Sequence, residues 1–136
     1  MAIGQDGDKL CEKVQSLIQQ LEKKNYLDRL AIKENDRIHC IRCDEIDWIG
    51  SHGNYVEIHS GKSSHLLREV ISRLETQLDP ARFIRIHRST IVNIDRIREL
   101  QPFFHAGYRV IMRDGTQLIL SRRFRDKVRE RLGQGI

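Results

Sequence analysis

The segment Tyr108-Arg-Val-Ile-Met-Arg-Asp-Gly-Thr-Gln-Leu-Ile-Leu120 decides the fold class of this 136-residue chain. Two largely apolar runs flank Arg113-Asp114-Gly115-Thr116, and Asp-Gly between such runs is the strongest short-range signal for a β-hairpin. Residues 108–112 and 117–120 are therefore predicted to pair as antiparallel strands.

Upstream of this hairpin, apolar residues recur near every second position and turn residues recur at short intervals, which is typical of short antiparallel strands. Leu30 and Ile32 precede Glu34-Asn35-Asp36, and Ile38 and Cys40 follow it, which predicts a second hairpin. Further extended segments are predicted at 48–49, 55–58, 65–67, 83–86, 91–94 and 97–104, with a loop over Gly50-Ser51-His52-Gly53-Asn54. The sequence thus predicts a mainly β fold.

Two helices are predicted to interrupt and to close this run of strands. The first covers 69–78, where the apolar residues share one face and Asp79-Pro80 ends the helix. The second covers 122–132, between Ser121 as the N-cap and Gly133 as the stop. The apolar faces consist of Val70, Ile71, Leu74 and Leu78 in the first helix, and of Phe124, Val128 and Leu132 in the second.

The N-terminal region is predicted to lie outside the β domain, which covers 29–133. Residues 1–8 are polar and contain glycine, so they are expected to be an unstructured start or a cloning remnant. Residues 9–28 predict an amphipathic linker helix. Its narrow apolar stripe contains Leu10, Val14, Leu17, Ile18 and Leu21. The stripe would pack on the domain or pair with its copy in a homodimer, and the dimer is favoured because so short a helix is marginal alone.

Positive charge is concentrated in the second half of the chain. The whole sequence has 24 basic and 19 acidic residues, a net charge of +5. Residues 82–131 contain thirteen basic residues against five acidic ones, and twelve of the thirteen are arginines. The planar guanidinium suits phosphates and guanine edges better than the lysine ammonium does. This half is therefore predicted to present a polyanion-binding face, although charge runs are also typical of plain solvated surface.

The sequence also argues against several classes of protein. No run approaches the roughly 18 to 20 apolar residues that span a bilayer, and no signal sequence opens the chain, so a cytoplasmic protein is expected. Three cysteines favour reduced thiols. Cys40 is expected to be half-buried, and the pair Cys40-x-x-Cys43 lacks the second ligand pair of a structural zinc site.

Motifs of nucleotide-binding loops, serine hydrolases and zinc proteases are absent from the sequence. His87-Arg88-Ser89 with Asn93 superficially resembles a kinase catalytic loop, but serine replaces the catalytic aspartate. We therefore predict a protein without enzymatic activity, cofactor or metal.

Polar side chains of the kind that contact nucleic acids are placed in or beside predicted turns. They are His52 and Asn54, then His87-Arg88-Ser89, then Arg122-Arg123. Arginine pairs bidentately with guanine and asparagine with adenine, while serine binds phosphate. Each group also has a structural interpretation. His-Gly-Asn is typical of a bare turn, Arg88 would form a salt bridge to Asp95 or Glu99, and Arg122-Arg123 would be a solvated helical turn, although positive charge there opposes the helix dipole.

These motifs together resemble a known family. Phe83-Ile-Arg-Ile-His-Arg-Ser-Thr-Ile-Val-Asn93 is similar to the central signature of LytTR DNA-binding domains. Asp44-Glu-Ile-Asp-Trp-Ile49 with Gly53-Asn-Tyr-Val56 resembles the first half of the family pattern, and Leu120-Ser-Arg-Arg-Phe124 resembles its closing segment. The resemblance extends from about Leu30 to Leu132 and excludes the N-terminal helix.

The resemblance implies an elongated β fold that inserts loops into successive major grooves, as the output domain of a bacterial transcriptional regulator. Carried over by position, the base contacts would come from His52, Asn54, Arg88 and Arg122. The contacts to the DNA backbone would come from Ser51, Ser89, Arg123 and Arg125. Such a domain would bind double-stranded promoter DNA with repeated half-sites, behind a sensory or receiver module that this chain does not contain.

A second hypothesis remains open, in which the domain is a protein-interaction or dimerisation module whose basic face binds an acidic partner. The core is predicted independently of function. Trp48, Phe83, Ile86, Ile91, Val110 and Leu118 should be buried, and Phe124 and Val128 should attach the last helix to the sheet.

Overall fold

A computed structural model describes residues 14, 26–103 and 107–133 of the chain. The predicted segments 1–8 and 9–28 lie outside the described residues, apart from Val14 and 26–28. Residues 26–28 are not helical, so the predicted linker helix does not reach the start of the domain. Instead, the Leu27 amide donates to the carbonyl of Gln77 at 2.8 Å.

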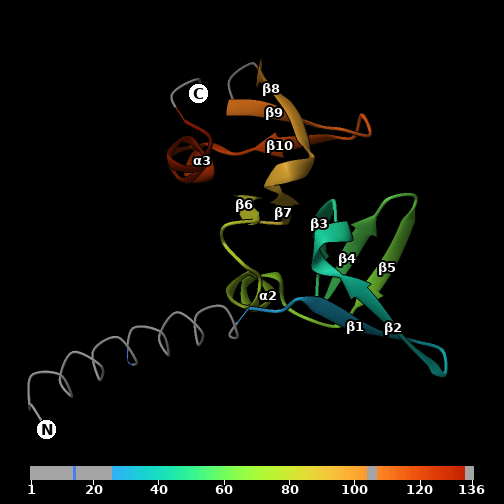
Figure 1. Cartoon of the computed structure of the whole chain (residues 1–136). Coiled ribbons are helices and arrows are strands. Elements are labelled where there is room, and N and C mark those ends of the chain that lie inside the picture. The colour runs from blue at the N-terminus through green and yellow to red at the C-terminus, as the bar shows by residue number, and fades with distance from the viewer. Residues whose placement is uncertain (1–13, 15–25, 104–106, 134–136) are drawn as a thin grey trace, which may run out of the picture.

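The described chain is mainly β, with one internal helix and one C-terminal helix, as predicted (Figure 1). The strands are β1 (Arg29–Glu34), β2 (Arg37–Arg42), β3 (Trp48–His52), β4 (Tyr55–Ser60), β5 (Ser63–Leu67), β6 (Phe83–His87), β7 (Thr90–Asn93), β8 (Ile97–Phe103), β9 (Gly107–Met112) and β10 (Gln117–Leu120). The helices are α2 (Ile71–Gln77) and α3 (Arg125–Leu132), with short 3-10 turns η1 (Cys43–Glu45), η2 (Ile94–Arg96) and η3 (Arg122–Phe124).

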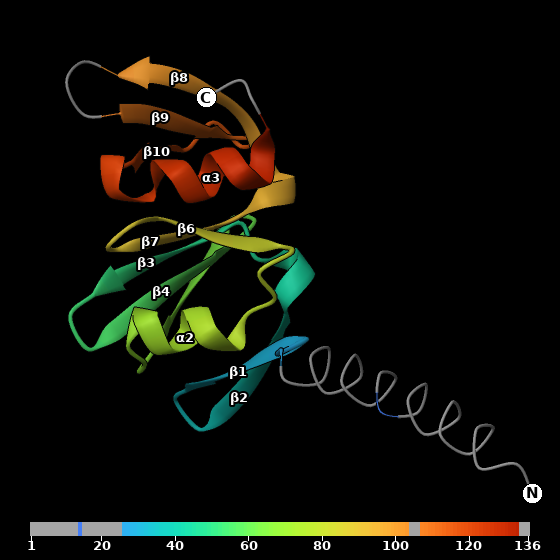
Figure 2. The ribbon, with the colours of Figure 1, turned by 90° about the vertical axis from the view of Figure 1, so that its left-hand side faces the viewer.

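These strands form three antiparallel sheets. The central sheet has five strands in the order β5-β4-β3-β7-β6, a second sheet has the order β10-β9-β8, and β1 and β2 form a separate hairpin. Figure 2 shows α2 and the β1–β2 hairpin on one side of the central sheet, with α3 and the three-stranded sheet on the other. The central sheet therefore has a layer packed on each face.

Two apolar clusters fill the spaces between these layers, because alternate residues of a strand point to opposite faces. The first cluster joins the central sheet to α2 and the β1–β2 hairpin, and it includes Ile32, Ile49, Ile58, Leu74 and Phe83. The second joins the central sheet to the three-stranded sheet and α3, and it includes Ile84, Ile86, Val110, Leu120 and Val128.

The predicted hairpins are confirmed, with local chemistry that explains their turns. Asn35 has a φ of +54° between β1 and β2, a conformation that asparagine tolerates better than most residues. In the β9–β10 turn the Thr116 amide donates to the Asp114 carboxylate at 2.9 Å. This bond lowers the pKa of Asp114 and stabilises the Asp-Gly turn.

The predicted loop over 50–54 is too long. Gly50, Ser51 and His52 belong to β3, and His52 pairs with Tyr55 across a turn that contains only Gly53 and Asn54. Glycine is favoured at position 50 of β3 for a steric reason, since a Cβ atom there would lie 2.9 Å from the ring of Trp48.

The prediction that Cys40 is half-buried is wrong. Ile38 is 68% exposed and Cys40 is also exposed, whereas Ile41 is buried. Cys40 pairs with Ala31 on the outer face of the hairpin, while Ile41 pairs with Leu30 on the face that packs against the core. The second thiol, Cys43, is buried, and burial raises its pKa to about 11.

Most of the predicted core is confirmed. Phe83, Ile86, Ile91, Val110 and Val128 are buried. Trp48, Leu118 and Phe124 are only partly buried, because they lie at the margin of the second cluster and pack against it from outside. In the internal helix Val70 is 51% exposed, and only Ile71, Leu74 and Leu78 of the predicted face are buried.

The C-terminal helix begins differently from the prediction. Ser121 makes no side-chain cap, and the chain first forms η3, in which the Phe124 amide donates to the Ser121 carbonyl at 3.1 Å. Gly133 ends α3 as predicted, with a φ of +97°. In the described part of the chain, no helix is long and apolar enough to cross a membrane.

Candidate nucleic-acid interface

Three chain segments that carry predicted site residues lie along one edge of the molecule. They are the β3–β4 turn, the β6–β7 turn and η3, which follow each other along the left-hand edge in Figure 2. Long-range backbone hydrogen bonds connect them. The Ser51 amide donates to the Ser89 carbonyl at 2.8 Å, and the Ser121 amide donates to the Ile86 carbonyl at 2.9 Å. We name this edge, formed by residues 51–54, 87–89 and 121–125, the turn edge.

The β3–β4 turn presents Asn54 to solvent. Gly53 has a φ of +65°, in the left-handed region that glycine adopts at low cost. No atom lies within 4 Å of where its Cβ would be, so the backbone conformation rather than crowding favours glycine here. A two-residue turn leaves Asn54 exposed at the tip of the β3–β4 hairpin.

His52 belongs to a small network rather than standing free. Its Nε2 lies 2.9 Å from a carboxylate oxygen of Glu57, and the other oxygen of Glu57 lies 3.4 Å from His59. The His59 ring stacks on Trp48 with centroids 3.8 Å apart, and burial lowers the pKa of His59. A base contact by His52 would therefore have to use its other ring nitrogen or separate it from Glu57.

The β6–β7 turn exposes Arg88. The alternative interpretation of Arg88, a salt bridge to Asp95 or Glu99, is not found in the described chain, and Glu99 pairs with Arg98 at 3.4 Å. Among the described residues, no ion pair to Arg88 is found. The hydroxyl oxygen of Ser89 lies 2.9 Å from Nδ1 of His87, within the same turn.

The η3 turn presents Arg122 and Arg123 as exposed residues. The Arg123 guanidinium lies 5.8 Å from the centroid of the Phe124 ring. Arg125, the first residue of α3, is half-buried, and its guanidinium lies 5.4 Å from the centroid of the Tyr108 ring. Arg125 therefore packs on the domain as well as carrying charge.

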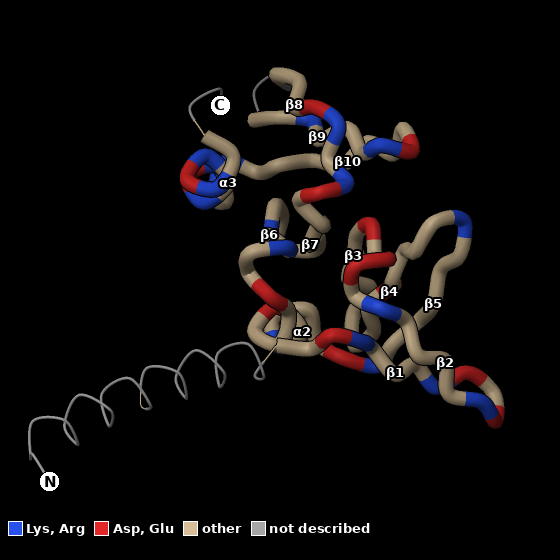
Figure 3. The backbone as a smooth tube through the Cα atoms, viewed as in Figure 1, with Lys and Arg blue, Asp and Glu red and all other residues tan. Residues whose placement is uncertain are grey.

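Figure 3 shows that basic residues continue along α3 beyond η3. Lys127, Arg129 and Arg131 follow Arg125 in this helix and are exposed. Part of the predicted concentration of positive charge thus lies beside the turn edge, whereas Arg96 and Arg113 lie elsewhere. No cluster of metal-ligand residues is present in the described segments.

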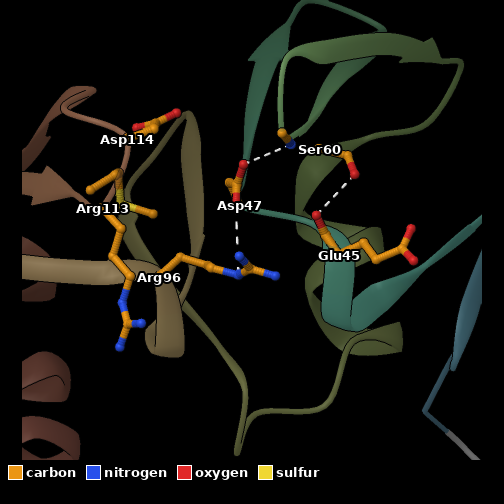
Figure 4. Close-up of a pocket in the computed structure, with 8 residues that line it drawn as sticks. Glu45, Asp47, Ser60, Arg96, Arg113 and Asp114 are labelled. Carbon is orange, nitrogen blue, oxygen red and sulfur yellow. Dashed lines mark hydrogen bonds and ion pairs between the residues drawn. The ribbon is translucent and has the colours of Figure 1, made fainter.

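Two polar residues of the sequence motifs have structural roles instead. Asn93 is 2% exposed, and its side-chain amide donates to the Ile46 carbonyl at 2.9 Å. Asp47 is 9% exposed, accepts a hydrogen bond from the Gly61 amide at 2.8 Å and pairs with Arg96 at 3.6 Å (Figure 4). These bonds satisfy buried polar groups that would otherwise destabilise the fold.

Asp47 lines a hollow of about 520 Å³ at the ends of β4 and β9 that are remote from the turn edge. The charged and polar side chains around it are Glu45, Asp47, Ser60, Arg96, Arg113 and Asp114 (Figure 4). Acidic and basic groups are mixed here, and Asp47 already binds Gly61 and Arg96. The hollow therefore carries charges of both signs, whereas the charged residues of the turn edge are all arginines.

Sequence reasoning missed two residues beside the site, Glu57 and Arg85. Glu57 contacts His52, and the Arg85 side chain contacts the backbone of the β6–β7 turn. Glu57 lies two residues after Tyr55 in an alternating strand, so no motif distinguished it. Arg85 is part of the central signature, but its inward direction could not be read from its spacing.

The fold and the turn edge together define a class of protein, a mainly β domain with exposed polar and arginine-bearing turns along one edge. The chain belongs to the LytTR family, because the family of the LytTr DNA-binding domain matches residues 36–133. LytTR domains are DNA-binding and non-enzymatic, which agrees with the prediction of a domain without catalysis.

Known relatives and a solved structure support this assignment. The chain is 34% identical over 109 residues to the transcriptional regulatory protein LytR of Staphylococcus aureus, and 29% identical over 104 residues to the sensory transduction protein LytT of Bacillus subtilis. These matches cover 80% and 76% of this chain, but only 44% and 43% of the relatives. The chain therefore spans less than half the length of these curated relatives.

The fold is similar to a LytTr DNA-binding domain of a putative methyl-accepting/DNA response regulator from Bacillus cereus. The TM-score is 0.73 with 20% sequence identity, and the match covers 79% of this chain and 99% of the other. This similarity concerns the fold.

Proposed function

We propose that this domain binds duplex DNA in a sequence-dependent way, as the output domain of a bacterial transcriptional regulator. The observation that carries the proposal is the alignment of three exposed turns along one edge, joined by the Ser51–Ser89 and Ser121–Ile86 backbone hydrogen bonds. The major groove is wide enough to admit a two-stranded β-ribbon, and its floor presents the base edges that specify sequence.

In this proposal Asn54, Arg88 and Arg122 contact base edges, with His52 beside them. The exposure of Asn54 and Arg88 and the absence of an ion pair to Arg88 in the described chain support these roles. Ser51, Ser89, Arg123 and Arg125 contact the DNA backbone. Because the turns succeed one another along the edge, we propose that they enter successive major grooves.

DNA binding by this edge should weaken steeply as salt rises. Each phosphate neutralised by a basic side chain releases counterions, which gives a log-log slope of about −0.9 per phosphate. The measurement is fluorescence anisotropy of a labelled duplex, selected from a random library by this chain, titrated from roughly 50 to 200 mM KCl. A scrambled duplex of the same composition is the control, and it should bind more weakly at every salt concentration.

A slope near zero would contradict the electrostatic contribution of the basic face. Equal affinity for the selected and scrambled duplexes would contradict sequence dependence. Failure to bind either duplex would favour the second hypothesis, in which the basic face binds an acidic protein.

We further propose that the domain works within a longer regulator with an N-terminal sensory or receiver module, and that residues 9–28 pair two copies on repeated half-sites. Two linked domains would bind repeated half-sites more tightly through effective concentration. Sedimentation equilibrium of the chain with and without residues 1–28 tests the pairing, and a dimer is expected only for the longer form. Equal monomer masses would show that the stripe does not pair.

A further inference from the structure

Arg85 lies behind the β6–β7 turn, with its side chain only 11% exposed. Its Nε donates to the His87 carbonyl at 2.9 Å, and its Nη2 donates to the Arg88 carbonyl. One guanidinium therefore binds the carbonyls on either side of the Arg88 Cα atom. Both carbonyls thus accept from Arg85, while the Arg88 side chain is exposed.

The same guanidinium is anchored to two other elements. Its Nη1 lies 3.1 Å from a Glu75 carboxylate oxygen in α2, and its central carbon lies 5.8 Å from the centroid of the Phe124 ring in η3. Arg85 thus connects the β6–β7 turn to α2 and to the segment that carries Arg122 and Arg123. These contacts engage the guanidinium N–H groups of Arg85 within the protein. We therefore expect Arg85 to influence DNA binding indirectly, through the residues that it holds.

The backbone needs such support at this position. The register between β6 and β7 shifts between Arg85 and His87, so the ladder is irregular just before the turn. A bulge re-aims the side chains that follow it and leaves backbone groups without ladder partners. The Arg85 side chain supplies partners for the His87 and Arg88 carbonyls at this irregular point.

We infer that Arg85 is a positioning residue for sequence readout, which fixes the β6–β7 turn so that Arg88 is held in one direction toward DNA. This inference rests on the proposed function. A planar fork of donors is needed, because a lysine ammonium cannot reproduce its geometry toward two carbonyls and a carboxylate. Glu75 balances the charge of the guanidinium and holds it against α2.

The test is Arg85→Lys, measured on the selected duplex and on the scrambled duplex. The loss of charge-assisted hydrogen bonds should weaken specific binding by about tenfold. Binding to the scrambled duplex should change by less than about twofold, because the positive charge is kept. Arg73→Lys, an exposed position in the same helix as Glu75, is the matched control and should leave both affinities unchanged.

A double-mutant cycle with Arg88→Ala separates positioning from general structural support. If Arg85 acts through Arg88, Arg85→Lys should add no further loss of discrimination in the Arg88→Ala background. The same tenfold loss in that background, or equal losses on both duplexes, would overturn the inference. If Arg85→Lys impairs folding in thermal melts, Glu75→Gln replaces it in the cycle with the same expected pattern and a smaller loss.

The outcomes also separate this inference from the proposed function. If the parent chain does not distinguish the two duplexes, the proposed function fails. If the parent distinguishes them and Arg85→Lys distinguishes them equally well, only the role of Arg85 is wrong.

Discussion

Phe83→Ala is expected to lower the free energy of unfolding by about 3 to 5 kcal/mol, because it removes a buried ring and leaves a cavity in a packed core. Phe83 is 6% exposed and belongs to the cluster that joins the central sheet to α2 and the β1–β2 hairpin. Its backbone is fixed as well, since its amide donates to the Asp79 carbonyl at 2.9 Å. The surrounding structure therefore has little freedom to close the cavity.

A loss of this size is a large part of the total stability of a small domain, which is usually about 5 to 15 kcal/mol. The melting temperature should fall by more than about 10 °C, as measured by circular dichroism together with urea titration. Leu66→Ala, at a residue that is 56% exposed in β5, is the control and should change stability by less than about 0.5 kcal/mol. An unchanged melting temperature for Phe83→Ala would contradict the described packing of β6.

The order of strands and helices was predictable because it depends on local signals. Asp114-Gly115 and Asn35-Asp36 define hairpin turns through conformations that few residues adopt cheaply. Asp79-Pro80 and Gly133 stop helices for reasons that involve only neighbouring residues. These elements therefore appear in the structure close to where the sequence predicts them.

The faces of the strands were harder to predict, because burial depends on what packs from elsewhere in the chain. Ile38 is as apolar as Ile41, but only Ile41 lies on the side of the β1–β2 hairpin that meets the core. The length of the β3–β4 loop was overestimated for a similar reason. Gly50 and Ser51 have weak strand preference, yet pairing with β4 and β7 places them in the sheet.

In the candidate site, too, features that depend on local sequence were predictable and features that depend on tertiary packing were not. Exposed turns with Asn54 and Arg88 were predictable from residue type, and the family resemblance assigned them roles. Their adjacency was not, because the Ser51–Ser89 hydrogen bond joins residues far apart in the sequence. The pairing of His52 with Glu57 and of Arg85 with Glu75 also depends on tertiary packing, and so it has no signal in residue spacing.

Arg88→Ala and Arg122→Ala are each expected to cost about 1 to 3 kcal/mol of binding free energy on the selected duplex and little on the scrambled one. This is the cost of losing a bidentate contact to a base edge. The variant proteins should lose their preference for one base over the others at defined base pairs. Competition with single-base variants of the selected duplex measures this loss. Asn54→Ala should have a similar effect, but the base preference should be lost at other base pairs of the DNA site, because Asn54 lies on a separate turn of the edge.

The controls for this experiment are residues expected to contact phosphate. Arg123→Ala should weaken binding to both duplexes similarly. It should also make the slope of log affinity against log salt concentration shallower by about one unit. Arg125→Ala is a less clean control, because its half-buried guanidinium packs over Tyr108. Truncating this side chain would remove packing as well as charge. The melting temperature of the Arg125→Ala variant must therefore be measured alongside its affinity for DNA.

Comparison of the two duplexes then separates base reading from electrostatic attachment. If Arg88 and Arg122 contact only phosphates, their truncation should reproduce the pattern of Arg123→Ala, with equal losses and a shallower slope. If Asn54→Ala, Arg88→Ala and Arg122→Ala each lost as much affinity for the selected duplex as for the scrambled one, direct readout would be contradicted. The proposal that the domain binds DNA would still stand. Sequence preference would then have to arise from DNA shape and deformability along the turn edge, and it would persist in all three variants.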